Sequence, residues 1–303
     1  MRFSVVIPVF NKANTVLETV QSVLAQHYKE REIIVVDDGS QDDLETALSS
    51  VRESICIIHQ KNAGVAAARN RGIQESKGDY ICFLDADDVW MPEHLSSLSA
   101  AIDAEPSAYF LSTMFRTTFP NGTVKSKLPM LSRCLEIYWV EDYFKMVLEY
   151  STTFIHTDSV CIKRSLLDEF RFEVGEKIGE DTDLWYRIAA YYPLLLVNKE
   201  TVIYRRELST ATAGGTNNLD WAFARRELHL INDKRIAPSK RRHIRLLLDR
   251  WRCTCCRQLL IQGRRKEAWQ YVKQLRYPLQ KRGVYCVALC ILPQSLQKKI
   301  IKI

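Results

Sequence analysis

Residues Gly78–Asp88, with the sequence GDYICFLDADD, contain the strongest single signal in this chain. The apolar run Tyr80–Leu84 has the length and composition of a buried strand, and three carboxylates follow it within four residues. Carboxylates this close repel one another unless a cation lies between them, and Mg²⁺ or Mn²⁺ commonly binds carboxylate oxygens together with substrate phosphates. The stretch therefore predicts a buried strand that ends at a metal site. The alternative is a solvated turn with a helix cap before Pro92.

The residues before this stretch alternate between strand and helix patterns. Continuous apolar runs predict strands at Phe3–Phe10, Glu32–Val36 and Ile55–Ile58. Helical spacing of apolar residues predicts helices at Thr15–Gln26, Asp43–Val51 and Ala63–Glu75. Strands connected by helices form right-handed crossovers, so the predicted fold class is α/β, with a mostly parallel sheet flanked by helices.

Polar clusters follow each of these strands. In open parallel sheets, ligands bind outside the carboxyl ends of the strands. We therefore expect the clusters to converge on one edge of the sheet. They are Asn11-Lys12, Asp37-Asp38, Gln60–Gly64 and Asp85–Asp88.

The second half of the chain is less regular. The pattern predicts a hairpin, a strand, a helix and a further strand, at Tyr109–Gly122, Phe154–Ile162, Asp181–Tyr191 and Leu194–Tyr204. From about Leu219 onward the pattern is helical. We therefore expect a first domain over residues 1–215 and a helical C-terminal region over residues 216–303.

Charge divides the chain near the same place. Residues 221–303 carry 21 Lys and Arg against 4 Asp and Glu, whereas residues 1–220 carry 22 against 32. Such a basic segment binds polyanions, which can be nucleic acid, an anionic membrane or phosphorylated substrates. Nucleic-acid binding would need exposed aromatic side chains between the basic ones. Because Trp251 and Trp269 fall within apolar patterns, we expect no nucleic-acid partner and keep that function only as an alternative.

The sequence predicts a cytoplasmic protein. Phe3–Phe10 is too short for a secretory signal, and no stretch reaches the roughly 18 apolar residues of a membrane-spanning helix. The nine cysteines are an odd number, which favours reduced thiols. A cluster of three cysteines is interpreted as buried thiols, and it comprises Cys253, Cys255 and Cys256. The alternative is a zinc site that Cys286 and Cys290 would join.

Five motifs in a fixed order make the chain similar to a known family. They are SVVIPVFN at Ser4–Asn11, IVVDDGS at Ile34–Ser40, NAGVAAARNRG at Asn62–Gly72, GDYICFLDADD at Gly78–Asp88 and GEDTDLWYR at Gly179–Arg187. Together they resemble the family 2 glycosyltransferases of the GT-A fold over roughly residues 1–210. Several independent motifs are far more specific than a lone Asp-x-Asp.

The resemblance implies a reaction and its partners. A sugar would pass, with inversion, from a nucleotide-sugar donor (usually UDP- or dTDP-linked) to a hydroxyl of a glycan or lipid-linked glycan, with Mn²⁺ or Mg²⁺ as cofactor. It also implies a place in bacterial cell-surface polysaccharide synthesis. The Gln-x-x-Arg-Trp motif of processive synthases is absent from the sequence, which favours transfer of a single sugar. The alternative is a catalytically inactive member that serves as a scaffold.

The resemblance assigns the nucleotide site to three segments. The loop after the first strand would lie against the nucleotide, through Pro8, Val9 and Asn11. Asp38 matches the acid that hydrogen-bonds the base. The segment beneath the nucleoside is matched by Asn62, Gly64 and Arg69.

The same resemblance assigns the reacting groups. Asp85 begins the Asp-x-Asp motif and would face the ribose or sugar, and Asp87 ends it and would bind the metal. Asp181 matches the catalytic base, which removes the proton of the acceptor hydroxyl. Arg205 or Arg206, after the last strand, would contact the pyrophosphate, and the alternative is a solvated pair at the strand end.

Several neighbouring residues have two interpretations. Glu180, Asp181 and Asp183 could be ordinary acids at a helix N-terminus, where the helix dipole stabilises them. Trp185 could be a sugar-stacking surface or a core residue. His156 is interpreted as a satisfied polar histidine rather than a metal or acceptor contact.

The last residues predict contact with a membrane surface. Val284–Leu292 is apolar but too short to span a bilayer. After Pro293, a helix would place Leu296, Ile300 and Ile303 on one face and Lys298, Lys299 and Lys302 on another. We therefore expect peripheral association with the inner face of the cell membrane. The alternative is that both segments pack on the catalytic domain.

Overall fold

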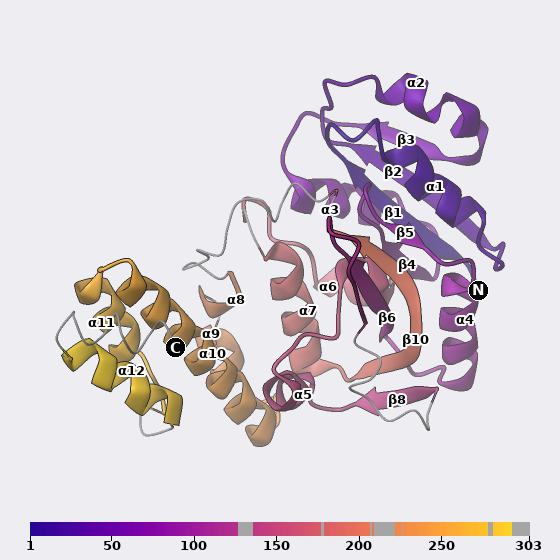
Figure 1. Ribbon diagram of the computed structural model, residues 1–303. Coiled ribbons are helices and arrows are strands. Elements are labelled where there is room, and N and C mark those ends of the chain that lie inside the picture. Colours follow the sequence, from indigo (N-terminus) through magenta and orange to yellow (C-terminus); the bar gives the residue numbers. More distant parts are fainter. Residues whose placement is uncertain are drawn as a thin grey trace. The chain divides into compact units, whose positions relative to one another are not determined.

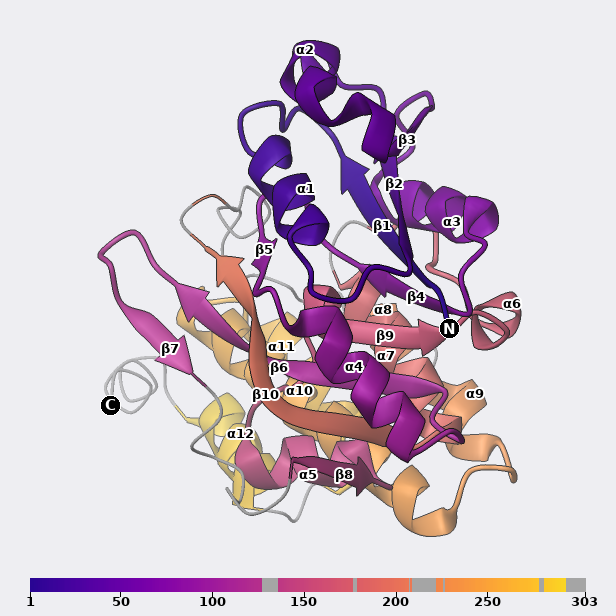
Figure 2. The same cartoon turned by 90° about the vertical axis from the view of Figure 1, so that its right-hand side faces the viewer.

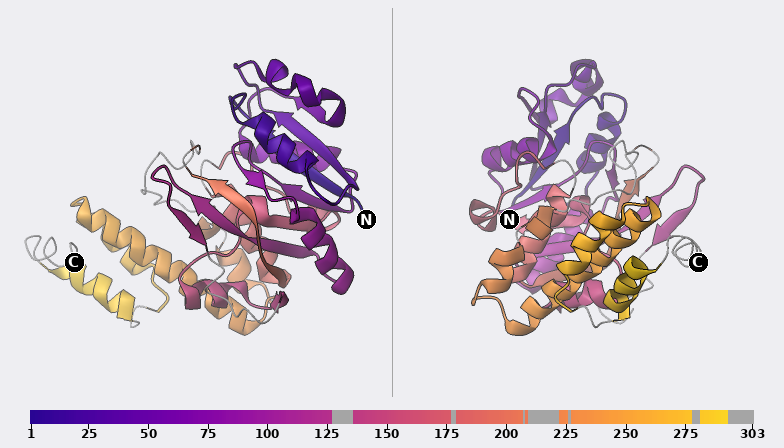
Figure 3. Two further views of the ribbon diagram at one scale, coloured as in Figure 1. Left: turned by 45° about the vertical axis from the view of Figure 1, so that its right-hand side comes forward. Right: turned by 90° about the vertical axis from the view of Figure 1, so that its left-hand side faces the viewer.

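The computed structural model describes residues 1–126, 136–176, 179–206, 208, 222–225, 227–277 and 281–292. The chain divides into two compact units, of which the first comprises Met1–Tyr143 and Thr152–Gly214. The second comprises Phe144–Ser151 and Gly215–Ile303. The first unit is α/β and the second is helical (Figure 1 and Figure 3).

The first unit is built on one sheet, with the strand order β3-β2-β1-β4-β9-β6-β10-β5. Its first four strands are β1 (Phe3–Val9), β2 (Arg31–Asp37), β3 (Cys56–His59) and β4 (Tyr80–Phe83). They pair in parallel. The helices that connect them are α1 (Val16–Leu24), α2 (Leu44–Leu48) and α3 (Val65–Glu75), shown in Figure 2. The α/β prediction is confirmed.

Beyond β4 the sheet is mixed. β9 (Val160–Lys163) lies antiparallel between β4 and β6 (Phe110–Thr118). β10 (Leu194–Arg205) runs parallel to β6, while β5 (Val89–Trp90) and β8 (Ile137–Val140) are antiparallel to β10. The predicted hairpin is confirmed, because β7 (Val124–Ser126) folds back on β6. The strand predicted from Phe154 begins only at Val160, since the 3-10 helix η3 (Thr157–Ser159) precedes it.

The two faces of the sheet carry different helices. Phe3, Val5, Ile7 and Val9 of β1 belong to the core that includes α1 and α4 (His94–Ala104). Val6 faces α3, whose Gly72 lies so close that a Cβ there would come within 2.2 Å of Val6 Cγ1. Only glycine permits this approach of helix to strand.

α7 (Glu180–Tyr191) covers the face of the sheet that α3 also covers. Its Trp185 is buried against the rings of Phe83, Phe110 and Phe172. Phe83 is the register partner of Val6 on the neighbouring strand. Of the two interpretations of Trp185, the structure therefore supports the core residue.

His94, the first residue of α4, is a buried titratable group. Its ring stacks on Trp90 with the centroids 4.1 Å apart, and its Nδ1 lies 2.7 Å from Thr201 Oγ1. Burial lowers the pKa of His94 from 6.5 to about 3. Between these two values the unfolded chain binds a proton that the folded chain does not bind, so stability falls as the pH drops below about 6.5. At pH 5 this single group should cost about 2 kcal/mol of unfolding free energy relative to pH 7.

We expect His94→Gln to remove that part of the acid sensitivity, since glutamine can still hydrogen-bond Thr201 and takes up no proton. Urea unfolding at pH 7 and at pH 5 measures the effect. The same substitution at His27, which is exposed, is the control. Equal acid sensitivity in the wild type and His94→Gln would contradict the prediction.

The second unit consists of helices. One of them is α5 (Tyr143–Tyr150), which belongs to this unit from Phe144 onward. The others are α8 (Ala222–Arg225), α9 (Glu227–Asn232), α10 (Pro238–Ile261), α11 (Arg265–Lys273) and α12 (Lys281–Ile291). Trp251 packs edge-on against Tyr271 with their centroids 5.7 Å apart, and Trp269 packs against the core between α10, α11 and α12. Both tryptophans lie in apolar packing, as predicted.

That core contains free, buried cysteines from α10 and α12. Cys256 Sγ and Cys290 Sγ are 3.7 Å apart, and Cys286 donates to the Cys253 carbonyl. The interpretation as buried thiols is confirmed. In the part of the chain that the structure describes, no helix is both long and apolar enough to cross a membrane. The interfacial helix predicted after Pro293 lies outside the described residues.

Candidate active site

Hydrogen bonds tie the carboxyl ends of β1 and β2 together. Asn11, with a φ of 52°, donates its N–H to Ser40 Oγ at 3.0 Å, and its Oδ1 accepts from the Gln41 N–H at 2.7 Å. The Asp38 N–H donates to the Val9 carbonyl at 2.8 Å. The expected convergence of the loops after β1 and β2 is confirmed.

Asp38 also holds the loop after β3 at this edge. Its carboxylate accepts hydrogen bonds from the Gln60 side chain at 2.7 Å, the Ala63 N–H at 2.9 Å and the Gly64 N–H at 2.8 Å. Gly64 has a φ of +91°, and a Cβ built on it would meet nothing within 4 Å. The backbone at Gly64 is therefore open to a ligand. Asn62 lies in the same loop and is exposed.

Pro8 and Val9 do not lie in the loop after the first strand. They are the last two residues of β1 and are buried, because β1 stays paired with β2 as far as Val9. The exposed residues at this strand end are Phe10 and Asn11. This corrects the predicted position of Pro8 and Val9, whose side chains face away from solvent.

Arg69 is a buried guanidinium that joins acids from two distant segments. Its Nη2 donates to Asp85 Oδ1 at 2.7 Å and its Nη1 donates to Glu180 Oε1 at 2.9 Å. Its Cζ lies 5.3 Å from the centroid of the Phe172 ring. Arg69 thus fixes the start of the Asp-x-Asp motif relative to the first turn of α7, a bridge that the sequence did not predict.

The pKa values of this ion-paired group follow from burial and charge. Burial would lower the pKa of Arg69, but the carboxylates of Asp85 and Glu180 raise it above its ordinary value. Burial would raise the pKa of Asp85, but Arg69 holds it below the usual range. Burial and the neighbouring charge of Asp181 raise the pKa of Glu180. Removing either partner of such a buried pair leaves an uncompensated charge.

Asp87 is mostly buried and is paired with a cation. Its Oδ2 accepts from Lys12 Nζ at 2.7 Å. Arg205, at the end of β10, donates its Nε to the Asp87 carbonyl at 2.5 Å and its N–H to Asp88 Oδ1 at 2.6 Å. Arg205 therefore holds the acidic loop in place. Arg206, the alternative, has its Cζ 5.5 Å from the centroid of the Phe119 ring.

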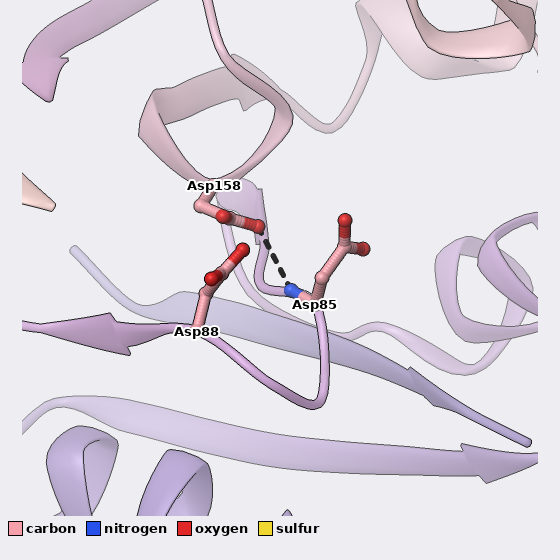
Figure 4. A group of neighbouring side chains, drawn as sticks. All are labelled: Asp85, Asp88 and Asp158. Carbon is pink, nitrogen blue, oxygen red and sulfur yellow. Dashed lines mark hydrogen bonds between the residues drawn. The ribbon is translucent and has the colours of Figure 1, made fainter. Parts of the chain in front are cut away.

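Three carboxylates form a cluster at this loop: Asp85, Asp88 and Asp158 offer oxygens that lie within 4.8 Å of one another. Asp158 comes from η3, and its Oδ1 accepts the Asp85 N–H at 2.8 Å. Figure 4 shows the Asp88 side chain directed toward Asp158, while the Asp85 carboxylate points away from that pair. The expected alternative of a plain solvated turn does not describe this loop, since Asp88 and Asp158 are buried.

The carboxyl groups of Asp88 and Asp158 repel each other. Burial and the charge of Asp85 together raise the pKa of Asp158 to about 8, and burial and the charge of Asp158 raise the pKa of Asp88 well above its usual range. The two groups therefore hold a proton between them near neutral pH. With Asp85 and Asp87 they provide hard oxygen donors, which are the ligands that Mg²⁺ and Mn²⁺ prefer, so the residues present fit such an ion.

Asp181 lies in the first turn of α7, where the helix dipole stabilises a carboxylate. Its Oδ2 accepts from Thr157 Oγ1 at 2.8 Å and its Oδ1 accepts from the Thr182 N–H at 2.6 Å. Asp181 is partly exposed. Asp183 is fully buried and accepts from Arg187 Nε at 2.8 Å, so this acid has a structural partner.

His156 lies beside the acidic cluster. Its Nδ1 is 3.1 Å from Asp158 Oδ2, and its ring centroid lies 4.4 Å from that of Tyr204 and 5.0 Å from that of Phe115. These contacts agree with a polar histidine held by its neighbours.

Sequence reasoning assigned no role to three residues that the structure brings to this site. Lys12 and Asp88 were in the predicted polar clusters, but only Asp87 was given a metal role. Asp158 lies about 70 residues after Asp85, and no spacing links the two. Asp158 lies inside the strand predicted at Phe154–Ile162, and an acid within that otherwise strand-like run was the available signal for it.

A sequence model described as Glycosyl transferase family 2 matches residues 4–171. The chain belongs to glycosyl transferase family 2. An uncharacterized glycosyltransferase of Rickettsia felis is 28% identical over 293 residues, which are 96% of this chain and 47% of that protein. The chain therefore spans about half the length of this relative. The amylovoran biosynthesis glycosyltransferase AmsB of Erwinia amylovora is 32% identical over 194 residues, 61% of this chain and 63% of AmsB.

A second relative and a solved structure extend the comparison. Glycosyltransferase GlyG of Streptococcus pneumoniae is 26% identical over 229 residues, 72% of this chain and 75% of GlyG. The crystal structure of S. aureus TarS residues 1–349 in complex with UDP-GlcNAc has a TM-score of 0.64 at 17% identity, covering 96% of this chain and 81% of that one. Together with the sheet described above, this likeness shows that the family 2 chain has the GT-A fold.

Proposed function

We propose that this family 2 chain is an inverting glycosyltransferase that moves one sugar from a UDP- or dTDP-linked donor to an acceptor hydroxyl, with Asp181 as the general base. The observation that carries the proposal is the buried Arg69. It holds Asp85 of the Asp-x-Asp loop and Glu180 of α7 with one guanidinium. The base at Asp181 is therefore fixed relative to the acids that face the donor.

The nucleoside would lie across the carboxyl edge of β1 to β3. Asn11 and Asn62 are exposed there, and the backbone at Gly64 is open. Asp38 contributes by ordering the loop after β3, and its carboxylate faces the same edge. Pro8 and Val9 would form the floor beneath these groups.

Cations of the chain would offset the charge that develops on the leaving nucleoside diphosphate. Lys12 Nζ lies 2.7 Å from Asp87, at the loop that would face the phosphates. The Arg205 guanidinium, which donates to the Asp87 carbonyl and pairs with Glu18, would add positive charge at the same loop. Bound Mn²⁺ or Mg²⁺, held by Asp87 with help from Asp85, would supply further charge neutralisation.

Asp181 would take the proton of the acceptor hydroxyl as the new bond forms. Thr157 and Thr182 each donate to one of its oxygens, which orients the carboxylate and leaves lone pairs on both oxygens. The acceptor hydroxyl attacks the anomeric carbon from the side opposite the diphosphate, so the configuration inverts and no protein nucleophile is needed.

The comparisons support a role in bacterial surface polysaccharide synthesis. AmsB is named for amylovoran biosynthesis, and TarS was solved with UDP-GlcNAc. We infer a nucleotide-sugar donor of that class and a glycan or lipid-linked glycan acceptor. A lipid-linked acceptor would place the enzyme on the cytoplasmic side of the membrane, as a peripheral protein.

A donor panel tests the proposed function. Thermal shift with UDP, dTDP, GDP and their sugar conjugates, each with and without Mn²⁺, should show stabilisation by UDP or dTDP ligands that depends on the metal. Ligand at 100 times its Kd adds about 2.7 kcal/mol to the unfolding free energy, so a shift of several degrees is expected. Stabilisation by none of these ligands would contradict the proposed donor class.

A further inference from the structure

Helix α12 (yellow in Figure 3) is apolar on two faces. Its inner face is buried in the core of the helical unit through Cys286, Leu289 and Cys290. Its outer face exposes large apolar side chains, with Val284 49%, Tyr285 41% and Ile291 65% exposed. A surface helix of a globular protein normally has polar residues opposite its buried stripe. The outer face of α12 therefore has the composition of a surface that a second partner covers.

The outer face is continuous. Val284, Ala288 and Ile291 follow one another at helical spacing, Tyr285 lies beside them, and the four positions span about 120° of the helix circumference. Ala288 is exposed as well. An apolar stripe of this width is what a helix buries against a core or a bilayer.

Basic side chains lie at the C-terminal end of this face. An open hollow of about 510 Å³ next to Ile291 is lined by Arg265, Lys266, Trp269, Gln270, Cys290 and Ile291. Arg265 donates to the carbonyls of Cys290 at 2.6 Å and Ile291 at 2.9 Å, which fixes a cation at the helix end. Arg264 and Lys266 beside it are exposed, and Arg264 also pairs with Glu267 at 2.6 Å on the surface. Apolar and cationic groups thus adjoin, as they do in segments that bind an anionic lipid surface.

We propose that the outer face of α12, together with the basic residues Arg264, Arg265 and Lys266, docks this protein on an anionic membrane. Val284, Tyr285 and Ile291 enter the boundary between headgroups and acyl chains, and the basic residues contact lipid phosphates. Charge complementarity favours this occupant over a second copy of the chain, because residues 221–303 carry 21 basic and 4 acidic residues and two such segments repel each other. The helix is too short to span the bilayer, so it lies in the interface.

Vesicle flotation of the full chain tests the docking surface. Binding is expected with vesicles of phosphatidylcholine plus phosphatidylglycerol and should be much weaker with phosphatidylcholine alone. Replacing both Val284 and Ile291 with Gln should lower the partition coefficient at least ~10-fold, since two large apolar side chains lose their burial. Val124→Gln with Val174→Gln is the matched control, because these valines are 56% and 60% exposed in the first unit. The control should bind as the wild type does.

Further measurements separate the components of the surface. Lys266→Gln with Arg264→Gln should weaken binding and reduce its dependence on salt. Lipids brominated along the acyl chain should quench Trp fluorescence in the wild type and less so in Trp269→Phe. Circular dichroism and the thermal midpoint check that each variant is folded.

Three outcomes would overturn the proposal. The first is equal binding to neutral and anionic vesicles, and the second is unchanged binding of the variant in which Val284 and Ile291 are replaced. The third is a wild-type protein that binds no vesicles but forms a dimer which this variant disrupts. Docking goes beyond the proposed sugar transfer. Metal-dependent UDP binding in solution, measured on the same variants, reports on the donor site separately, so failure of one does not imply failure of the other.

Discussion

Replacing Asp181 with asparagine should lower the rate of sugar transfer by roughly 10²–10⁴-fold, the usual cost of losing a general base. Asparagine keeps the shape of the side chain. Its amide oxygen can still accept from the Thr182 N–H while its NH2 group donates to Thr157 Oγ1, so the first turn of α7 should stay in place. What is lost is the capacity to take a proton from the acceptor hydroxyl. Turnover with a transferable acceptor, measured by release of nucleoside diphosphate, gives the effect.

Donor affinity is the internal control for this variant. Because Asp181 would act on the acceptor, calorimetric titration with UDP and Mn²⁺ should give nearly the same Kd for the wild type and Asp181→Asn. Turnover near the wild-type value would move the role to another acid. Glu180 would then be the first acid to test, since it adjoins Asp181 in the same helix turn, whereas Asp183 has no exposed surface and is paired with Arg187.

Replacing Asp87 with asparagine should abolish the part of UDP affinity that depends on Mn²⁺. A carboxylate ligand contributes several kcal/mol to holding a divalent ion, so we expect a loss of about 100-fold or more in the presence of the metal. Asparagine is preferred over alanine because Asp87 is mostly buried, with a side chain 13% exposed and paired with Lys12. Calorimetric titration of UDP with and without Mn²⁺ measures the metal-dependent and the metal-independent part of the UDP affinity.

Two further variants help to interpret the result for Asp87→Asn. Asp103→Asn removes the same charge from an exposed position of α4 and should leave UDP binding unchanged. Lys12→Met frees the Asp87 carboxylate from its ion pair, so Mn²⁺ alone should bind at least as tightly as in the wild type. An Asp87→Asn protein that keeps its metal-dependent affinity would refute the assignment and direct attention to Asp88 and Asp158.

The sequence alone predicted the first half of the sheet well. Apolar runs of strand length, each separated by a helical pattern, leave few alternatives to parallel crossovers. The ends of the strands then place the polar clusters at one edge, whatever their identity. The predicted helix at Asp181–Tyr191 differs from α7 by a single residue at its start, because Gly179 marks the N-terminus.

Prediction was less complete where strands pair across long sequence separations. β9 pairs antiparallel with β4 and β6, and its strand pattern alone does not reveal its direction. The strand was expected from Phe154, but local hydrogen bonds between His156 and Ser159 form η3 instead. Side-chain to backbone bonds of this kind compete with strand pairing and are not visible in hydrophobic periodicity.

The sequence by itself determined the fold class, the edge of the sheet at which the polar clusters gather and the family to which the chain belongs, because these depend on local periodicity and on motifs of consecutive residues. Only the tertiary structure decided which charges meet. Arg69 pairs with Asp85 and also with Glu180, which lies 111 positions further along the chain. Asp158 meets Asp85 across a separation of 73 positions and lies in the same cluster as Asp88. Burial raises the pKa of each of these carboxyl groups, and the charges beside it then raise that pKa further or lower it. Such contacts depend on how distant elements pack together, and no local pattern in the sequence encodes them.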